Sequence, residues 1–71
     1  MNFFEYAEKL EMIKYLCLHK RTGTPQQLAD KLHVSERTIQ RMIQKLREHG
    51  YVITFNRFRI TYEIDDPSEK N

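Results

Sequence analysis

The 71-residue chain has one cysteine, two glycines and no tryptophan. The single cysteine, Cys17, cannot form a disulfide within the chain, which agrees with a reducing compartment. The two glycines, Gly23 and Gly50, are too few for a glycine-rich loop that binds phosphate. The longest uncharged apolar run, from Tyr15 to Leu18, is far shorter than the roughly 20 residues that a membrane-spanning helix needs. We therefore expect neither a disulfide framework, nor a nucleotide-binding loop, nor a membrane span.

The sequence also lacks the groupings that catalysis requires. Its length allows one domain, which buries only about 60% of the surface of the unfolded chain and leaves little room for a deep pocket. The three histidines, His19, His33 and His49, are scattered, and none shares a metal-ligand spacing with Cys17. We therefore expect no enzyme activity, no metal, no cofactor and no small-molecule ligand, and we interpret Cys17 as a core residue.

Charge is unevenly distributed along the chain. Residues 1–13 carry a net charge of −2, residues 14–59 carry +7 and residues 60–71 carry −3, within a total of only +2. Glu5, Glu8 and Glu11 lie where a signal peptide would have its apolar segment, so we expect a cytoplasmic protein. A basic middle between acidic ends is typical of a surface that binds a polyanion, although charge alone fits a mixed solvated surface equally well.

The first predicted helix spans about residues 3–19. It follows Asn2, a good N-cap, and Glu5 stands where the second partner of a capping box belongs. Apolar residues recur along it at three- and four-residue steps and form one stripe: Phe3, Tyr6, Leu10, Ile13 and Cys17.

The second predicted helix is short, over about residues 25–32. Thr24 is its N-cap, Pro25 suits the first helical position and Gln27 completes a capping box. Its apolar residues share one face: Leu28, Ala29 and Leu32.

The third predicted helix spans about residues 36–49. Ser35 is its N-cap, and Gly50 stands where a left-handed residue would end it. At 100° per residue its apolar side comprises Ile39, Met42, Ile43 and Leu46.

Two alternating apolar segments, 51–55 and 58–64, predict a β-hairpin. A two-residue loop, Asn56-Arg57, would place every apolar side chain of both strands on one face. Asn56 tolerates the positive φ that such a turn needs. This register pairs Phe55 with Phe58, Ile53 with Ile60 and Tyr51 with Tyr62.

The predicted fold class is α+β, mainly α, with three helices followed by a two-stranded antiparallel hairpin. A lone hairpin is not stable in water, so its apolar face must pack on the helices. We place this domain at residues 1–64. Residues 65–71 are acidic and lack apolar side chains, which predicts a disordered tail.

The outward side of the third helix is polar. Arg37, Arg41, Gln44 and Glu48 cluster opposite the apolar side, and Gln40 and Lys45 flank them. Arginine pairs bidentately with guanine and glutamine with adenine, so these side chains suit a DNA major groove. For an isolated helix, the alternative of a merely solvated amphipathic face would be favoured. The short helix and tight turn before it favour the DNA interpretation.

Residues 24–41 resemble a known motif. Leu28-Ala29, then Val34-Ser35, Thr38-Ile39 and Arg41 follow the pattern of the type 11 helix-turn-helix in bacterial winged-helix regulators. The similarity, to DeoR-like regulators and biotin-ligase repressors, extends over about residues 10–64. It implies a winged helix-turn-helix that binds double-stranded DNA in a sequence-specific way, with the third helix in the major groove and the hairpin as wing.

The resemblance also implies roles for individual residues. Ser35 and Thr38 would contact phosphate, while Arg37, Gln40 and Arg41 would face bases or nearby phosphates. The complete predicted DNA-binding set is Thr24, Ser35, Arg37, Thr38, Gln40, Arg41, Gln44, Lys45, Arg57 and Arg59.

The chain departs from the family pattern at three places. His33 replaces a turn glycine, and histidine enters the left-handed region more readily than most residues. Met42 replaces a frequent aspartate and is either additional core or a partner contact. The predicted two-residue wing tip is short, so we expect Arg57 and Arg59 to reach backbone phosphate at most.

Two questions stay open from the sequence. The first helix carries further apolar residues that predict either a homodimer contact or a larger core: Phe4, Met12, Tyr15, Leu16 and Leu18. A small transcriptional regulator is the favoured function. The alternatives are a winged helix that binds protein, and an accessory DNA-binding protein of replication or of a mobile element.

Overall fold

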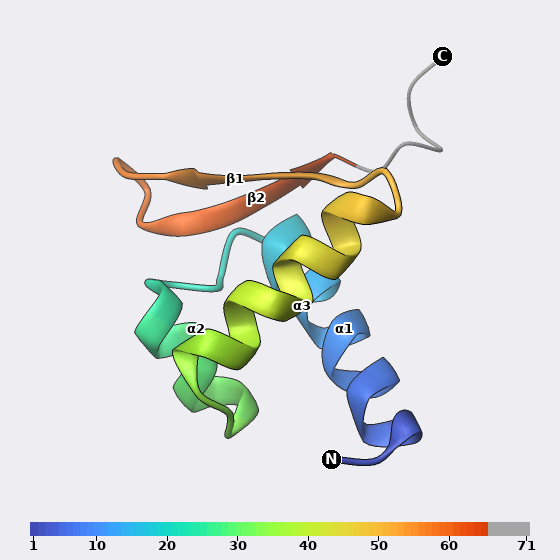
Figure 1. The fold of residues 1–71 in the computed structure, drawn as a ribbon. Helices are drawn as coiled ribbons and strands as arrows, with labels where there is room; N and C mark the ends of the chain where they lie inside the picture. Colours follow the sequence, from blue (N-terminus) through green and yellow to red (C-terminus); the bar gives the residue numbers. More distant parts are fainter. Residues whose placement is uncertain (66–71) are drawn as a thin grey trace.

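The computed structural model describes residues 1–65 as three helices followed by a hairpin (Figure 1). The helices are α1 (Phe3–Leu18), α2 (Pro25–Leu32) and α3 (Glu36–Glu48), and the strands are β1 (Val52–Asn56) and β2 (Thr61–Asp65). The predicted order of elements and the mainly helical winged helix-turn-helix architecture are therefore confirmed. Within residues 1–65 no helix has the length and apolarity to cross a membrane.

The hairpin ends one residue later than predicted, because Asp65 is the last residue of β2. The disordered tail had been predicted to begin at Asp65, so its first residue belongs to the sheet instead. The rest of that predicted tail, residues 66–71, lies outside the described residues.

Side-chain caps begin all three helices. The Asn2 side chain accepts a hydrogen bond from the Glu5 N–H at 2.9 Å. At α2 the reciprocal capping box is complete, because the Thr24 hydroxyl accepts from the Gln27 N–H at 3.1 Å and the Gln27 side chain accepts from the Thr24 N–H at 2.9 Å. The Ser35 hydroxyl accepts from the Thr38 N–H at 3.2 Å and starts α3. The polar residues that predicted the helix starts therefore perform the capping.

The helix ends use left-handed residues, as predicted. His33 has a φ of 57° after α2, and the next N–H, that of Val34, donates to the Ala29 carbonyl at 3.0 Å. Gly50, two residues after α3, has a φ of 95°. The tight turn between α2 and α3 is therefore made without glycine at its left-handed position.

The core lies among the three helices and one face of the hairpin. Met42 is fully buried, so it is a core residue and does not contact a partner. Phe3, by contrast, is 80% exposed at the start of α1, where the predicted apolar stripe extends past the packed helices. The buried hydrophobic residues are Ile13, Cys17, Leu28, Ala29, Leu32, Ile39, Met42, Ile43, Leu46, Ile53 and Tyr62.

The predicted register of the hairpin is wrong. Phe55 faces Tyr62 and Ile53 faces Ile64, so the strands are offset by four residues from the expected pairing. A two-residue turn at Asn56-Arg57 would require positive φ at both residues, which arginine adopts poorly. Asn56 remains in β1, and residues 57–60 form a four-residue turn.

The offset of four keeps every strand side chain on its predicted face, because strand side chains alternate with a period of two. The rings of Phe55 and Tyr62 pack edge to face on the inner side, with centroids 5.0 Å apart. Two apolar residues are displaced from the sheet into the turn. Phe58 is 99% exposed, and Ile60 has a φ of 53°, a strained value for a β-branched residue.

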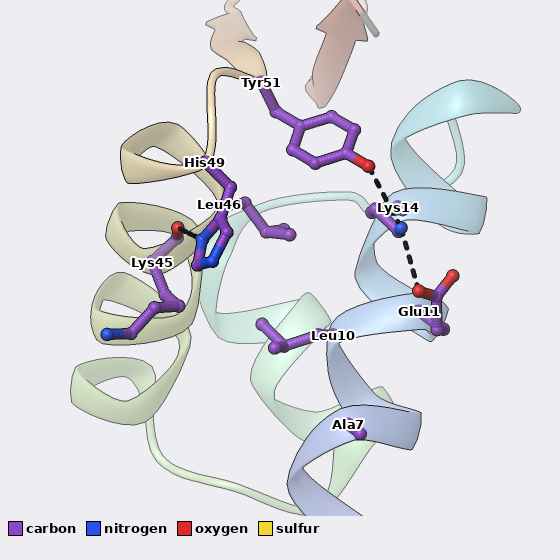
Figure 2. A pocket seen from close by; sticks show the side chains of 8 residues that line it. All are labelled: Ala7, Leu10, Glu11, Lys14, Lys45, Leu46, His49 and Tyr51. Carbon is purple, nitrogen blue, oxygen red and sulfur yellow. Dashed lines mark hydrogen bonds and ion pairs between the residues drawn. The ribbon is translucent and has the colours of Figure 1, made fainter. Parts of the chain in front are cut away.

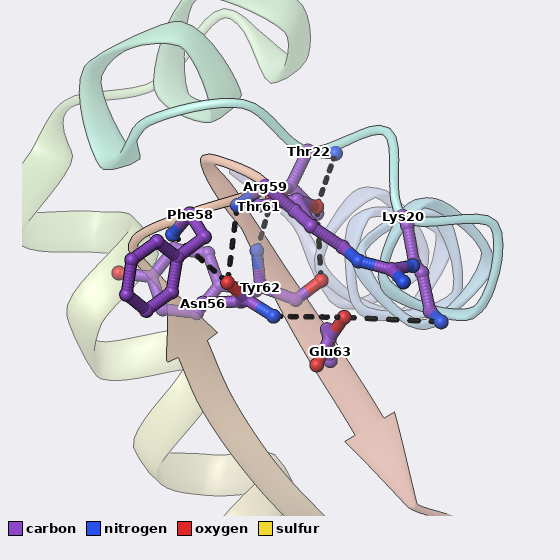
Figure 3. Close-up of polar contacts among 8 residues, drawn as sticks. All are labelled: Lys20, Thr22, Asn56, Phe58, Arg59, Thr61, Tyr62 and Glu63. Carbon is purple, nitrogen blue, oxygen red and sulfur yellow. Dashed lines mark hydrogen bonds and ion pairs between the residues drawn. The ribbon is translucent and has the colours of Figure 1, made fainter.

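A buried hydroxyl pair joins the hairpin to the segment between α1 and α2 (Figure 3). The hydroxyls of Thr22 and Thr61 lie 3.0 Å apart, and the Tyr62 N–H donates to the Thr22 hydroxyl at 2.7 Å. The guanidinium of Arg47 donates from Nη2 to the Ile53 carbonyl at 2.8 Å and so ties β1 to α3. These bonds fix the direction in which the hairpin leaves the helices.

Candidate nucleic-acid interface

The outward side of α3 is a polar surface backed by the core. Ile39 and Ile43 are fully buried and hold the helix against α2 and the hairpin. The predicted readout residues all lie exposed on the opposite side: Arg37, Gln40, Arg41 and Gln44. We call these four residues the α3 face.

The two arginines of the α3 face form no ion pair with any residue of 1–65. The ion pairs within residues 1–65 are Lys14 with Glu11, Lys20 with Glu63, and Lys45 with Glu48. Arg37 and Arg41 take part in none of them. Their guanidiniums therefore remain available for phosphate oxygens or for guanine edges.

The first turn of α3 adds hydroxyl groups beside the α3 face. The Ser35 and Thr38 hydroxyls lie 3.1 Å apart, with Ser35 exposed and Thr38 half-buried. Because the Ser35 oxygen already accepts from the Thr38 N–H, the pair forms a fixed polar group at the positive end of the helix dipole. Thr24 lies apart from them, half-buried at the start of α2.

The wing turn supplies a second group of exposed cations. Arg57 and Arg59 are both exposed, and neither joins an ion pair in the part of the chain that the structure describes. The Arg59 side chain extends back along the hairpin towards Lys20, whereas the Phe58 ring extends to the other side of the turn (Figure 3). The two wing arginines are thus held on a separate element from the α3 face.

A family model for the helix-turn-helix (HTH) domain matches residues 8–59, from the second turn of α1 to the wing turn. The chain belongs to this family. No curated protein and no solved structure matches the chain. Membership accounts for the arrangement of α2, the His33 turn and α3, and it makes this HTH domain a DNA-binding domain with DNA as its partner.

Lys45 lies at the edge of the HTH domain's predicted site. It pairs with Glu48 at 3.7 Å and borders a cleft of about 360 Å³ between α1 and α3 (Figure 2). The Lys45 side chain extends away from α1 in Figure 2 and is exposed. Lys45 lies one helical turn after Arg41, on the flank of the α3 face where the helical wheel places it.

Polar contacts join several of the side chains that line the cleft. Lys14 donates to the Tyr51 hydroxyl at 3.3 Å and pairs with Glu11 at 2.8 Å (Figure 2). The hydrogen bond to Glu11 raises the pKa of Lys14, and the contact with Tyr51 adds to that effect. The His49 ring lies 2.8 Å from the Lys45 carbonyl. These groups join α1 to the end of α3 and leave the charges of the α3 face untouched.

Sequence reasoning missed three residues that position the HTH domain's two cationic elements. Arg47 was not singled out, because a flanking position on the wheel does not show that its guanidinium reaches the Ile53 carbonyl. Thr22 and Thr61 carry no local signal of their contact, since 39 residues separate them. Threonine is a common residue both in connecting segments and in strands, so only the tertiary fold reveals that these two side chains pair.

Proposed function

We propose that the protein is a sequence-specific reader of double-stranded DNA and a small bacterial transcriptional regulator of the DeoR-like or biotin-repressor type. In this function α3 lies in the major groove with its polar face towards the base edges. The observation that carries the proposal is the exposure of Arg37 and Arg41 on the α3 face, on the side of the helix that points away from the core. Neither arginine has an acidic partner in residues 1–65.

The chemistry of the α3 face matches base recognition. Arg37 and Arg41 can each donate two parallel hydrogen bonds to guanine O6 and N7, and Gln40 and Gln44 can pair with adenine N6 and N7. Ser35, Thr38 and Thr24 lie at helix starts, where hydroxyls and free N–H groups suit phosphate oxygens. Lys45, Arg57 and Arg59 add charge that attracts the DNA backbone without reading sequence.

The outward side of α1 supports a homodimer in this function. Phe4 is 77% exposed and Tyr15 is 62% exposed, so a large apolar area lies open on the helix. An antiparallel pairing of two α1 helices would bury this area. It would also set the acidic first half of one helix, with Glu5 and Glu8, against the basic residues that follow the other helix, Lys20 and Arg21. Two HTH domains would then address two half-sites about one turn of DNA apart.

In vitro selection of duplexes from a random pool, at two salt concentrations, tests the function. We expect enrichment of a short G- and A-containing motif, because arginine and glutamine dominate the α3 face. A palindromic product would support the dimer as well. Enrichment of no motif, together with binding that salt does not weaken, would contradict DNA reading and favour a protein-binding module.

The dimer has its own test. Sedimentation at micromolar concentration should give a dimer for the natural chain and a monomer for Tyr15→Glu, which places charge in the paired surface. Val52→Glu is the matched control, because Val52 is similarly exposed, at 46%, but lies on the hairpin. A monomer for the natural chain at every concentration would overturn the pairing of α1.

A further inference from the structure

We propose that Phe58 is an apolar wedge that enters the bound DNA duplex and unstacks one base step beside the site read by α3. This inference rests on the proposed function and adds to it a second mode of recognition, through the deformability of DNA. It starts from the wing turn, where the structure places an aromatic ring outside the fold.

Phe58 has almost no contact with the rest of the protein. Its side chain is 99% exposed, more than any other large hydrophobic residue described, although Phe55 three residues before it packs on Tyr62. The hairpin runs over the ends of α1 and α3, and its turn projects beyond them (Figure 1). An exposed ring at a projecting tip contributes little to the fold and is positioned for a partner.

The backbone that carries Phe58 is held rigidly. Asn56 Oδ1 accepts hydrogen bonds from the N–H groups of Phe58, at 2.9 Å, and Arg59, at 3.0 Å (Figure 3). The Asn56 side chain is itself 3.5 Å from Glu63 on the opposite strand, and the adjacent Thr61 is fixed to Thr22. The backbone of the turn therefore loses little conformational freedom on binding, which favours insertion over a loose surface contact.

The charge around the ring identifies the partner as a nucleic acid. Arg57 and Arg59 flank Phe58 in the chain, both are exposed, and neither is neutralised by an ion pair in residues 1–65. A turn that carries an apolar ring together with two exposed cations complements a duplex, in which stacked base faces lie beside phosphate strands. Side chains such as phenylalanine unstack base steps in just this way when they enter the minor groove.

A fluorescent base analogue gives a direct test. 2-Aminopurine, whose emission rises when it is unstacked, is placed in turn at each position of a duplex carrying the selected motif. The natural protein should raise the emission at one or two adjacent positions outside the bases read by α3. Phe58→Ala should abolish that rise and weaken binding about tenfold, the effect of losing one aromatic contact with a base.

Two comparisons separate the wedge from other roles of the ring. Val52→Ala shortens an exposed apolar side chain at the opposite end of the hairpin and should leave both emission and affinity unchanged. A mismatch at the unstacked step, which lowers the cost of opening it, should tighten binding of the natural protein several-fold and leave that of Phe58→Ala unchanged.

The outcomes distinguish this inference from the function on which it rests. If the natural protein enriches a motif and Arg41→Ala weakens binding, but Phe58→Ala matches the natural protein in emission and affinity, the wedge is overturned and DNA reading stands. If no duplex is enriched, the proposed function fails and the wedge fails with it. An emission rise that survives in Phe58→Ala would also overturn the wedge.

Discussion

The hydroxyls of Thr22 and Thr61 lie 3.0 Å apart in the interior, although 39 residues separate them in the chain. Both residues are almost completely buried. The pair satisfies two backbone groups as well, because Thr61 Oγ1 accepts from the Thr22 N–H at 3.2 Å and Thr22 Oγ1 accepts from the Tyr62 N–H at 2.7 Å. This small network sets the wing against the helices and thereby sets the wing arginines relative to α3.

Replacing Thr22 by valine should destabilise the fold by about 1–3 kcal/mol, because the buried Tyr62 N–H loses its acceptor while the side-chain volume is kept. Urea unfolding measures the change. Thr54→Val on the exposed side of β1 is the matched control and should alter the free energy of unfolding by less than about 0.5 kcal/mol. An equal effect of the two substitutions would show that the network does not hold the wing.

The wing turn should become more stable when its strain is removed. Ile60 has a φ of 53°, and a left-handed conformation costs a non-glycine residue about 1–2 kcal/mol. Ile60→Gly should therefore raise the free energy of unfolding by about 1 kcal/mol in urea titrations. Val52→Gly, at a similarly exposed strand position, should lower it, because glycine weakens a strand. A loss of stability in both variants would mean that the apolar contacts of Ile60 outweigh its backbone strain.

The helices and their order could be predicted because their signals are local. Thr24 and Gln27 cap α2 through residues three apart, and the spacing of Ile39 and Ile43 identifies the buried side of α3 without knowledge of the fold. The same spacing places Arg37 and Arg41 outward. The main elements of the candidate site therefore followed from the periodicity of one helix.

The register of the hairpin could not be predicted in this way. Two registers that differ by four residues place the same side chains on the same face, so apolar alternation cannot choose between them. The choice depends on the Asn56 side chain, which closes the longer turn, and on the buried contact of Thr61 with Thr22. As a consequence, Phe58 lies at the tip of the wing, whereas the predicted register placed it on the apolar face of the hairpin.

Stability should fall at alkaline pH because of Cys17. Burial raises the pKa of this thiol to about 12, compared with 9.0 for an exposed thiol. Below pH 9 the thiol is protonated in both states. Above pH 9 only the unfolded chain releases the proton, so the free energy of unfolding decreases as pH rises towards the pKa of the folded state, by up to about 1.4 kcal/mol per pH unit.

Urea titrations between pH 8 and pH 11 measure this slope. Cys17→Ala is the matched variant: it is less stable overall, but its unfolding should lack the part of the slope due to the thiol. Lys14, whose pKa is also raised, titrates in both proteins and cancels in the comparison. Identical slopes for the two proteins would contradict a thiol that stays protonated in the folded state.

Arg41 and Arg57 should differ in the kind of binding energy that they supply. Arg41→Ala should weaken binding to the selected duplex by about 1–3 kcal/mol and relax the preference at one base pair, because a bidentate contact with guanine is lost. Arg57→Ala should act more weakly and equally on all sequences, and it should reduce the salt dependence of binding by about one phosphate contact. Gel shifts on the selected and on scrambled duplexes at several salt concentrations measure both effects. Since both side chains are exposed, neither change should alter the fold. Equal losses on both kinds of duplex from the two substitutions would mean that the α3 face holds DNA by charge alone and does not read its sequence.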